Sequence, residues 1–275
     1  MALEFRILGP LEVVQDGAAV SLGGRLRRSL VATLVLQAGE AVSTDRLIEE
    51  LWPEDHEGAL ARLQVYVSQV RKQLGADAGA LETRPGGYAL VIGDEALDAH
   101  RFERLARAGA AALAAGEPER AAGVLREALA LWRGPALADL VYEPFAQTPA
   151  ARLEERRTGC LEDRIEADLA LGHHDEVVAE LEALVAQQPL RERTCGQLML
   201  ALYRSGRQAE ALDVYRRTRR TLQEELGLEP GPELQELQQA ILRQDASLRI
   251  EAPELRARRH LPAPPTALVG RRREL

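Results

Sequence analysis

Cysteine and long apolar runs are scarce in the 275-residue sequence, and each scarcity disfavours a class of protein. The two cysteines, Cys160 and Cys195, stand alone in helical patterns, so two reduced, buried thiols are expected rather than a disulfide framework. No apolar run reaches the roughly 18 residues of a membrane-spanning helix. The N-terminus lacks the basic and apolar regions of a secretory signal. We therefore expect a globular cytoplasmic protein.

Patterns that carry catalytic chemistry are also missing. The five histidines do not combine with cysteines or carboxylates at the spacing of a metal site. No phosphate-binding loop, dinucleotide fingerprint or nucleophile elbow occurs. The sequence therefore predicts neither an enzyme nor a bound metal or cofactor.

The formal net charge of −8 argues mildly against nucleic acid, so the distribution of charge matters. Residues 1–93 carry nine basic and twelve acidic side chains, and these are segregated along the chain. Six acids and one base lie within residues 45–57, whereas basic residues gather at 25–28 and 62–84. A domain that is acidic overall can still present one basic face, and a solvated surface of mixed charge is the alternative.

The first 40 residues read as short strands followed by a helix. Residues 3–22 contain β-prone runs around a turn at Asp16-Gly17, which is a good hairpin signal. After Gly24 the apolar residues follow a helical period until Gly39, which ends that helix.

Two more helices and a hairpin complete the pattern up to residue 93. A second helix is capped by Ser43 or Thr44 and stopped by Pro53. A third helix spans about 58–74, and residues 81–92 form two strands around Pro-Gly-Gly. The third helix directly precedes this wing, where a recognition helix belongs. The pattern predicts a winged helix-turn-helix domain of the response-regulator type at residues 1–93.

From Asp94 onward the sequence is almost entirely helical in pattern and contains an internal repeat. Gly172 and Gly206 are separated by the 34-residue tetratricopeptide period, and Gly116 marks an earlier repeat 56 residues upstream. The extra length includes a long helix near 149–171. We expect residues 94–249 to form an all-α, tetratricopeptide-like domain that serves protein contacts. The whole protein is thus predicted to be mainly α with a small β component.

The outer face of the third helix has the chemistry of a major-groove reader. With Leu63, Val67, Val70 and Leu74 directed to the core, polar and small side chains remain outside. Glutamine pairs with adenine, arginine or lysine with guanine, and valine contacts the thymine methyl group. The candidate base-reading residues are Arg62, Gln64, Val65, Ser68, Arg71 and Lys72.

Other residues are candidates for contacts with the DNA backbone. An arginine cluster opens the first helix, whose N-terminal amides are also suited to a phosphate, although a solvated face remains an alternative. The glycines of the wing permit a close backbone approach. The candidates are Arg25, Arg27, Arg28, Thr44, Arg84, Gly87 and Tyr88.

An acidic stretch separates the second and third helices. Like charges repel, so these carboxylates do not favour DNA. They either face solvent or offer a surface to a basic partner such as RNA polymerase. The candidates for that contact are Glu49, Glu50, Glu54, Asp55 and Glu57.

Taken together, these segments resemble the SARP family, the Streptomyces antibiotic regulatory proteins. In the N-terminal part the resemblance rests on Arg25–Leu30 (RLRRSL), Thr44–Ile48 (TDRLI) with Leu51-Trp52, Leu63–Arg71 (LQVYVSQVR) and Pro85–Tyr88 (PGGY). In the helical part, which resembles the bacterial transcriptional activation domain of the family, it rests on Phe102–Leu105 (FERL), Ala130–Leu137 (ALWRGPAL), Glu143–Phe145 (EPF) and Leu226–Pro230 (LGLEP).

The resemblance implies a cytoplasmic activator of secondary-metabolite genes. Such proteins bind direct repeats near the −35 promoter element side by side, as a dimer on double-stranded DNA, and recruit RNA polymerase with its housekeeping sigma factor. Arg62 departs from the small residue that is usual in the family. The main alternative is a helical-repeat adaptor whose winged domain serves protein contacts and does not bind DNA.

A separate prediction concerns the last 26 residues. Residues 250–275 read as an Arg- and Pro-rich linker. Its end, with Val269-Gly270-Arg271 and Glu274-Leu275, resembles the opening of a nucleotide-binding ATPase domain in the large family members. We therefore expect the N-terminal part of a longer protein, and assign no nucleotide site.

Overall fold

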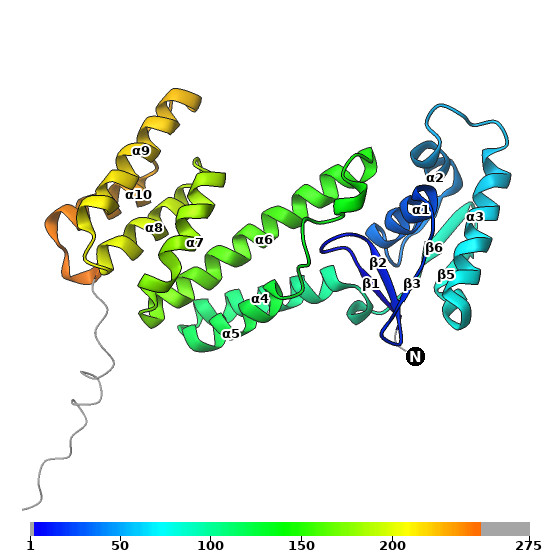
Figure 1. Ribbon diagram of the computed structural model, residues 1–275, viewed down its shortest axis with the longest axis horizontal. Coiled ribbons are helices and arrows are strands. Elements are labelled where there is room, and N and C mark those ends of the chain that lie inside the picture. Colours follow the sequence, from blue (N-terminus) through cyan, green and yellow to red (C-terminus); the bar gives the residue numbers. More distant parts are fainter. Residues whose placement is uncertain (1–2, 249–275) are drawn as a thin grey trace, which may run out of the picture. The chain divides into compact units, whose positions relative to one another are not determined.

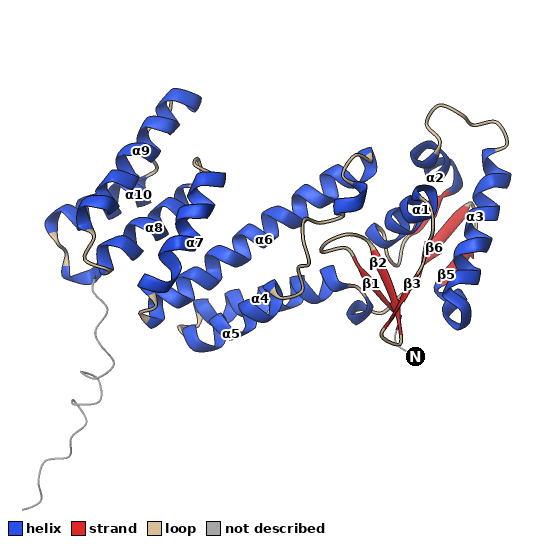
Figure 2. Ribbon diagram, in the orientation of Figure 1, coloured by secondary structure: helices blue, strands red, loops and turns tan. Residues whose placement is uncertain are grey.

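The computed structural model describes residues 3–248, which fold into two compact units that divide between Leu171 and Gly172. The protein is mainly helical with two small sheets, as predicted (Figure 2). The predicted linker at 250–275 and its motif lie outside the described residues. Over residues 3–248, no helix combines the length and the apolar character needed to cross a bilayer.

Unit 1 begins with the predicted strands and helices (Figure 1). Its first sheet has the antiparallel order β1-β2-β3, and its second has the order β4-β6-β5. The elements are β1 (Leu3–Arg6), β2 (Glu12–Gln15), β3 (Ala18–Val20), α1 (Arg25–Leu36), β4 (Ala41–Ser43), α2 (Thr44–Leu51), α3 (Ala59–Leu74), β5 (Leu81–Arg84) and β6 (Gly87–Leu90). Sequence reasoning missed β4, because three residues are too few to show a period.

The ends of α3 follow from local backbone chemistry. Gly58 precedes the helix at φ +65° and Gly75 follows it at φ +54°, a region that favours glycine. The inward stripe of Leu63, Val67 and Val70 is buried in the core of the winged domain, as predicted. The hydrophobic period therefore fixes which face of α3 remains outside.

Three further helices belong to the same unit. They are α4 (Asp98–Ala114), α5 (Pro118–Leu129) and α6 (Pro144–Leu171), and they pack on one another (Figure 1). Gly116 makes the α4–α5 turn at φ +74°, as the repeat predicted. The long helix was expected from about residue 149; it begins at Pro144, and Pro149 lies inside it.

The winged domain and α4 are joined by backbone as well as side chains. Phe5 of β1 forms an isolated parallel bridge with Leu97. The buried carboxylate of Asp98 accepts the backbone N–H groups of Ile7 at 2.8 Å and Leu8 at 3.0 Å. The expected domain boundary at residues 93 and 94 thus lies inside a compact unit, and the division into domains at that point stays a prediction.

The segment between α5 and α6 returns to the N-terminal strands. Arg133 and Leu137 donate their backbone N–H groups to the carbonyl oxygens of Leu8 and Ile7, at 2.8 and 3.0 Å. The ring of Trp132 meets Phe102 edge to face, with centroids 5.3 Å apart. The ALWRGPAL segment therefore links α4 to the loop that follows β1.

Unit 2 contains α7 (His174–Gln187), α8 (Glu192–Arg204), α9 (Gln208–Leu226) and α10 (Pro232–Arg243). Gly206 makes the α8–α9 turn at φ +77°, which confirms the repeat position read from the sequence. Gly227 ends α9 in the left-handed region at φ +69°.

Candidate nucleic-acid interface

The outer face of α3 is exposed and carries four of the six candidate base-reading residues. Gln64, Ser68 and Lys72 are exposed polar side chains, and Val65 between them is 53% exposed. Amide, hydroxyl, ammonium and methyl groups are thus presented together on one helix. These are the groups that major-groove edges recognise.

Arg62, by contrast, is held by the protein itself. Its guanidinium lies over the Trp52 ring, 4.9 Å from the centroid, and donates to an Asp55 carboxylate oxygen at 2.9 Å. It also donates to the backbone carbonyls of Asp55 and Glu57 at 2.7 and 3.1 Å. The hydrogen bond from Arg62 holds the pKa of Asp55 below its usual range. Arg62 therefore orders the loop between α2 and α3.

Arg71 ties α3 to the wing. Its Nε and Nη2 donate to the carbonyl of Leu81, at 2.9 and 2.7 Å, and Nη2 also reaches the Thr83 hydroxyl at 2.9 Å. Both partners lie on β5. The side chain thus sets the position of the wing relative to α3, and a base contact by Arg62 or Arg71 stays an untested prediction.

The wing is the β5–β6 hairpin, turned at Pro85-Gly86 with Gly86 at φ +76°. Gly87 is buried against β4, where an added Cβ would lie 2.0 Å from the Val42 carbonyl oxygen. Tyr88 is 7% exposed and belongs to the core. Packing of the strands therefore accounts for the residue types at positions 87 and 88. Their predicted contact with the DNA backbone remains untested.

Two other backbone candidates lie at the wing. Thr44 opens α2 and donates its N–H to the Gly86 carbonyl at 2.9 Å, while Ser43 caps the helix by accepting the N–H of Arg46. Arg84 on β5 is exposed and pairs with Glu82 at 2.6 Å. An exposed pair of this kind is weak, so phosphate can compete for the guanidinium.

The three arginines of α1 have different surroundings. Arg25 pairs bidentately with the buried carboxylate of Glu143, and this hydrogen bond raises the pKa of Arg25. Arg28 pairs with Asp139 and donates to the Leu11 carbonyl at 2.7 Å. Arg27 folds over the Gly23 backbone instead. Arg25 and Arg28 therefore join α1 to the segment that precedes α6, and the predicted contacts of all three arginines with the DNA backbone stay untested.

Comparison with known proteins identifies the family of this chain. A model described as "Bacterial transcriptional activator domain" matches residues 97–242, and one described as "Transcriptional regulatory protein, C terminal" matches residues 18–90. The regulatory protein DnrI of Streptomyces peucetius is 40% identical, over 93% of this chain and 97% of DnrI. The chain belongs to the SARP family of transcriptional regulators. Its fold class and family were therefore predicted correctly from the sequence.

Other SARP relatives differ in length. The regulatory protein AfsR of Streptomyces coelicolor is 48% identical over 90% of this chain, which spans 25% of AfsR. A solved structure, Mycobacterium tuberculosis EmbR in complex with a low-affinity phosphopeptide, matches with a TM-score of 0.84 at 42% identity. That match covers 88% of this chain and 65% of the EmbR chain.

The acidic stretch of this SARP member is partly neutralised. Glu50 pairs with Arg46 at 2.9 Å, and Asp55 with Arg62. Glu49, Glu54 and Glu57 are exposed. These three remain the stronger candidates for a contact with a basic partner.

One exposed residue of α3 was missed by sequence reasoning. Gln69 lies outside on the same helix, one turn after Val65. The helical period places it about 120° from the centre of the buried stripe. It belongs to the outer face on the same grounds as Gln64.

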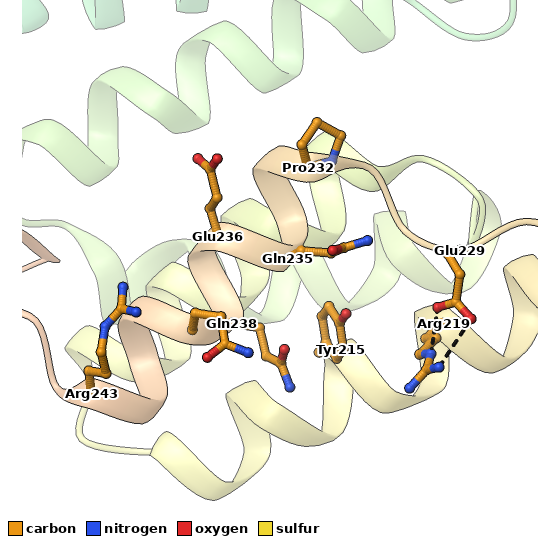
Figure 3. Close-up of a pocket in the computed structure, with 9 residues that line it drawn as sticks. Tyr215, Arg219, Glu229, Pro232, Gln235, Glu236, Gln238 and Arg243 are labelled. Atoms are coloured by element: carbon orange, nitrogen blue, oxygen red, sulfur yellow. Dashed lines mark hydrogen bonds and ion pairs between the residues drawn. The ribbon is translucent and has the colours of Figure 1, made fainter.

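The helical repeats of unit 2 carry a polar groove between α9 and α10 (Figure 3). Gln235, Gln238 and Gln239 line it, and the Arg219–Glu229 ion pair closes one end. Because Glu229 neutralises Arg219, the groove has no strong preference for one charge. We assign it no ligand.

Both thiols are buried, as predicted, and burial raises the pKa of Cys160 to about 12. Burial also raises the pKa of Cys195. Within residues 3–248 no group of three or more histidine, cysteine or carboxylate side chains has the arrangement of a metal site.

Proposed function

We propose that this SARP member is a sequence-specific DNA-binding activator of secondary-metabolite genes. It binds direct repeats near the −35 element, side by side as a dimer, and recruits RNA polymerase with its housekeeping sigma factor. The observation that carries the proposal is the exposed outer face of α3, with Gln64, Val65, Ser68 and Lys72 presented beside an ordered wing. The family membership supports the assignment to transcription regulation.

The contacts divide into two kinds. The four exposed residues of α3 read base edges, whereas Arg27, Thr44 and Arg84 hold the phosphate backbone. The acids Glu49, Glu54 and Glu57 are exposed, are repelled by the negatively charged duplex and meet a basic surface of the polymerase.

Titration of labelled promoter duplexes, with and without a direct repeat and at two salt concentrations, tests the DNA-binding part. We expect selective binding to the repeat, with an affinity that falls steeply as salt rises. Gln64→Ala and Lys72→Ala should weaken binding to the repeat. Absence of preference over scrambled and random duplexes would favour the adaptor alternative.

Recruitment of polymerase needs a separate assay. In a reconstituted transcription reaction, replacing Glu49, Glu54 and Glu57 by glutamine should reduce activation while leaving DNA affinity unchanged. Equal activation by the variant and the wild-type protein would remove this surface from the proposal.

A further inference from the structure

A valine lies beside the centre of the exposed face of α3, which Lys72 occupies. A helix turns by about 100° per residue, which places Val65 about 160° from the centre of the buried stripe. Ala61 lies on the same side, one turn earlier. The only other exposed large apolar residue of α3, Leu60, is 49% exposed but lies about 60° from that centre, at the flank.

The same face presents no free guanidinium. Arg62 and Arg71 lie at opposite flanks, about 100° and 80° from the centre of the buried stripe, and both are bound to the protein's own groups. Lys72 is the one cation of α3 on the outer face. Lys72 lies about 180° from the centre of the buried stripe, so recognition of guanine on this face falls to a lysine and not to an arginine.

The apolar pair of Val65 and Ala61, which flanks Lys72, suits one chemical group of the major groove. The C5 methyl of thymine is the apolar feature of that groove, and alanine or valine methyl groups pack against it. Gln69, one turn after Val65, carries the amide that pairs with adenine, the partner of thymine. Single exposed apolar residues are common at protein surfaces. The position of Val65 next to Lys72, near the centre of a groove-reading face, is what distinguishes it.

We propose that Val65, together with Ala61, packs against the C5 methyl of a thymine in each half-site and selects an A·T pair there. This inference rests on the proposed function. It assigns one base preference of α3 to methyl contact. Arg62 and Arg71 then position the α2–α3 loop and the wing.

The test begins with enrichment of random duplexes by the full chain. Each thymine of the enriched repeat is then replaced singly by deoxyuridine, which removes only the C5 methyl group. We expect one position per half-site at which the affinity of the wild-type protein falls about fourfold, the value of one buried methyl group. All other replacements should have little effect.

Two variants assign that effect to its side chain. Val65→Ala should bind the thymine duplex about fourfold more weakly than the wild type and should not distinguish thymine from deoxyuridine. Leu60→Ala is the matched control, since it removes an exposed apolar side chain from the flank of the same helix, and it should keep the fourfold difference. Circular dichroism checks that both variants fold.

The outcomes separate the two proposals. If no repeat is enriched, the DNA-binding function itself fails. If a repeat is enriched but deoxyuridine is neutral at every position, the methyl contact is refuted while the DNA-binding function stands. A deoxyuridine effect that persists unchanged in Val65→Ala would also refute the assignment to Val65.

Discussion

The ion pair between Arg28 and Asp139 joins α1 to the segment before α6, and we expect its loss to reduce stability rather than DNA affinity. Both side chains also hold the backbone of Leu11. Asp139 accepts the Leu11 N–H at 2.7 Å, and Arg28 donates to the Leu11 carbonyl at 2.7 Å. The Arg28 Nε donates to Asp139 Oδ2 at 2.7 Å. The three groups form one closed network.

The size of the effect follows from partial burial. The side chains of Arg28 and Asp139 are 28% and 24% exposed, so the pair is screened less than a surface pair but is still hydrated. We expect a coupling free energy of about 1–2 kcal/mol, above the surface median and below a fully buried pair. Arg28→Ala alone should cost about 2 kcal/mol, because the Leu11 carbonyl also loses its donor.

A double-mutant cycle measures this coupling. The four proteins are the wild type, Arg28→Ala, Asp139→Asn and the double variant; the amide oxygen of the substituted side chain still offers an acceptor for the Leu11 N–H. Urea unfolding followed by tryptophan fluorescence reports on unit 1, since Trp52 and Trp132 are the only tryptophans and both lie there. A coupling indistinguishable from zero would refute the structural role of the pair.

The salt dependence of DNA binding provides the second test of the same pair. Each phosphate contact contributes a slope of about 0.9 in a plot of log affinity against log salt. Arg28→Ala should leave the slope unchanged, whereas Arg27→Ala, the matched control on the same helix, should lower it by about 0.9. A lower slope for Arg28→Ala would show that Arg28 contacts phosphate, as the sequence first suggested.

Three other predictions concern stability and reactivity. Gly87→Ala should destabilise unit 1 by about 1–3 kcal/mol, because its Cβ meets the Val42 carbonyl, whereas Gly93→Ala, with open space around it, should be nearly neutral in the same urea titration. The pKa of Cys160 is raised from 9.0 to about 12, so at pH 8 its thiolate should be roughly a thousandfold scarcer than that of a free cysteine. Alkylation of Cys160 should therefore require unfolding, and rapid labelling of the folded protein would contradict its burial. Burial raises the pKa of Asp98, so its contribution to stability is full below the ordinary carboxyl pKa and is lost as the pH rises through the folded value. The wild type should therefore lose stability relative to Asp98→Asn as the pH rises above the ordinary carboxyl pKa, and a constant difference would argue against a raised pKa.

Much of the fold was readable because its signals are local. The periodicity of residues 59–74 identified α3 and its inner face. The glycines at 116 and 206 marked helix turns, and in the structure both adopt the positive φ that such turns require. The same local signals placed Gln64, Val65, Ser68 and Lys72 outside, where the structure has them. These features depend on residues a few positions apart, so they can be predicted from a single sequence.

Hydrogen-bond and ion-pair partners that are distant in sequence could not be predicted from such local signals. The sequence shows that Arg25, Arg28, Arg62 and Arg71 are cations near a predicted DNA-binding surface, but not that each guanidinium has acceptors in its own chain. Arg28 meets Asp139 across 111 positions of sequence, and Asp98 meets Ile7 across 91. Such pairs form only when the chain is packed, because the loop at residues 7–11 and the segment at 131–143 come together in one core.

The sequence by itself therefore determined the helices, the wing, the repeat turns, the family and the outer face of α3, since periodicity and turn chemistry are properties of short segments. Only the tertiary structure decided which arginines have acceptors in their own chain. A guanidinium is free or occupied according to the carboxylates and carbonyls around it, and here those acceptors come from the α2–α3 loop, from the wing and from the segment before α6.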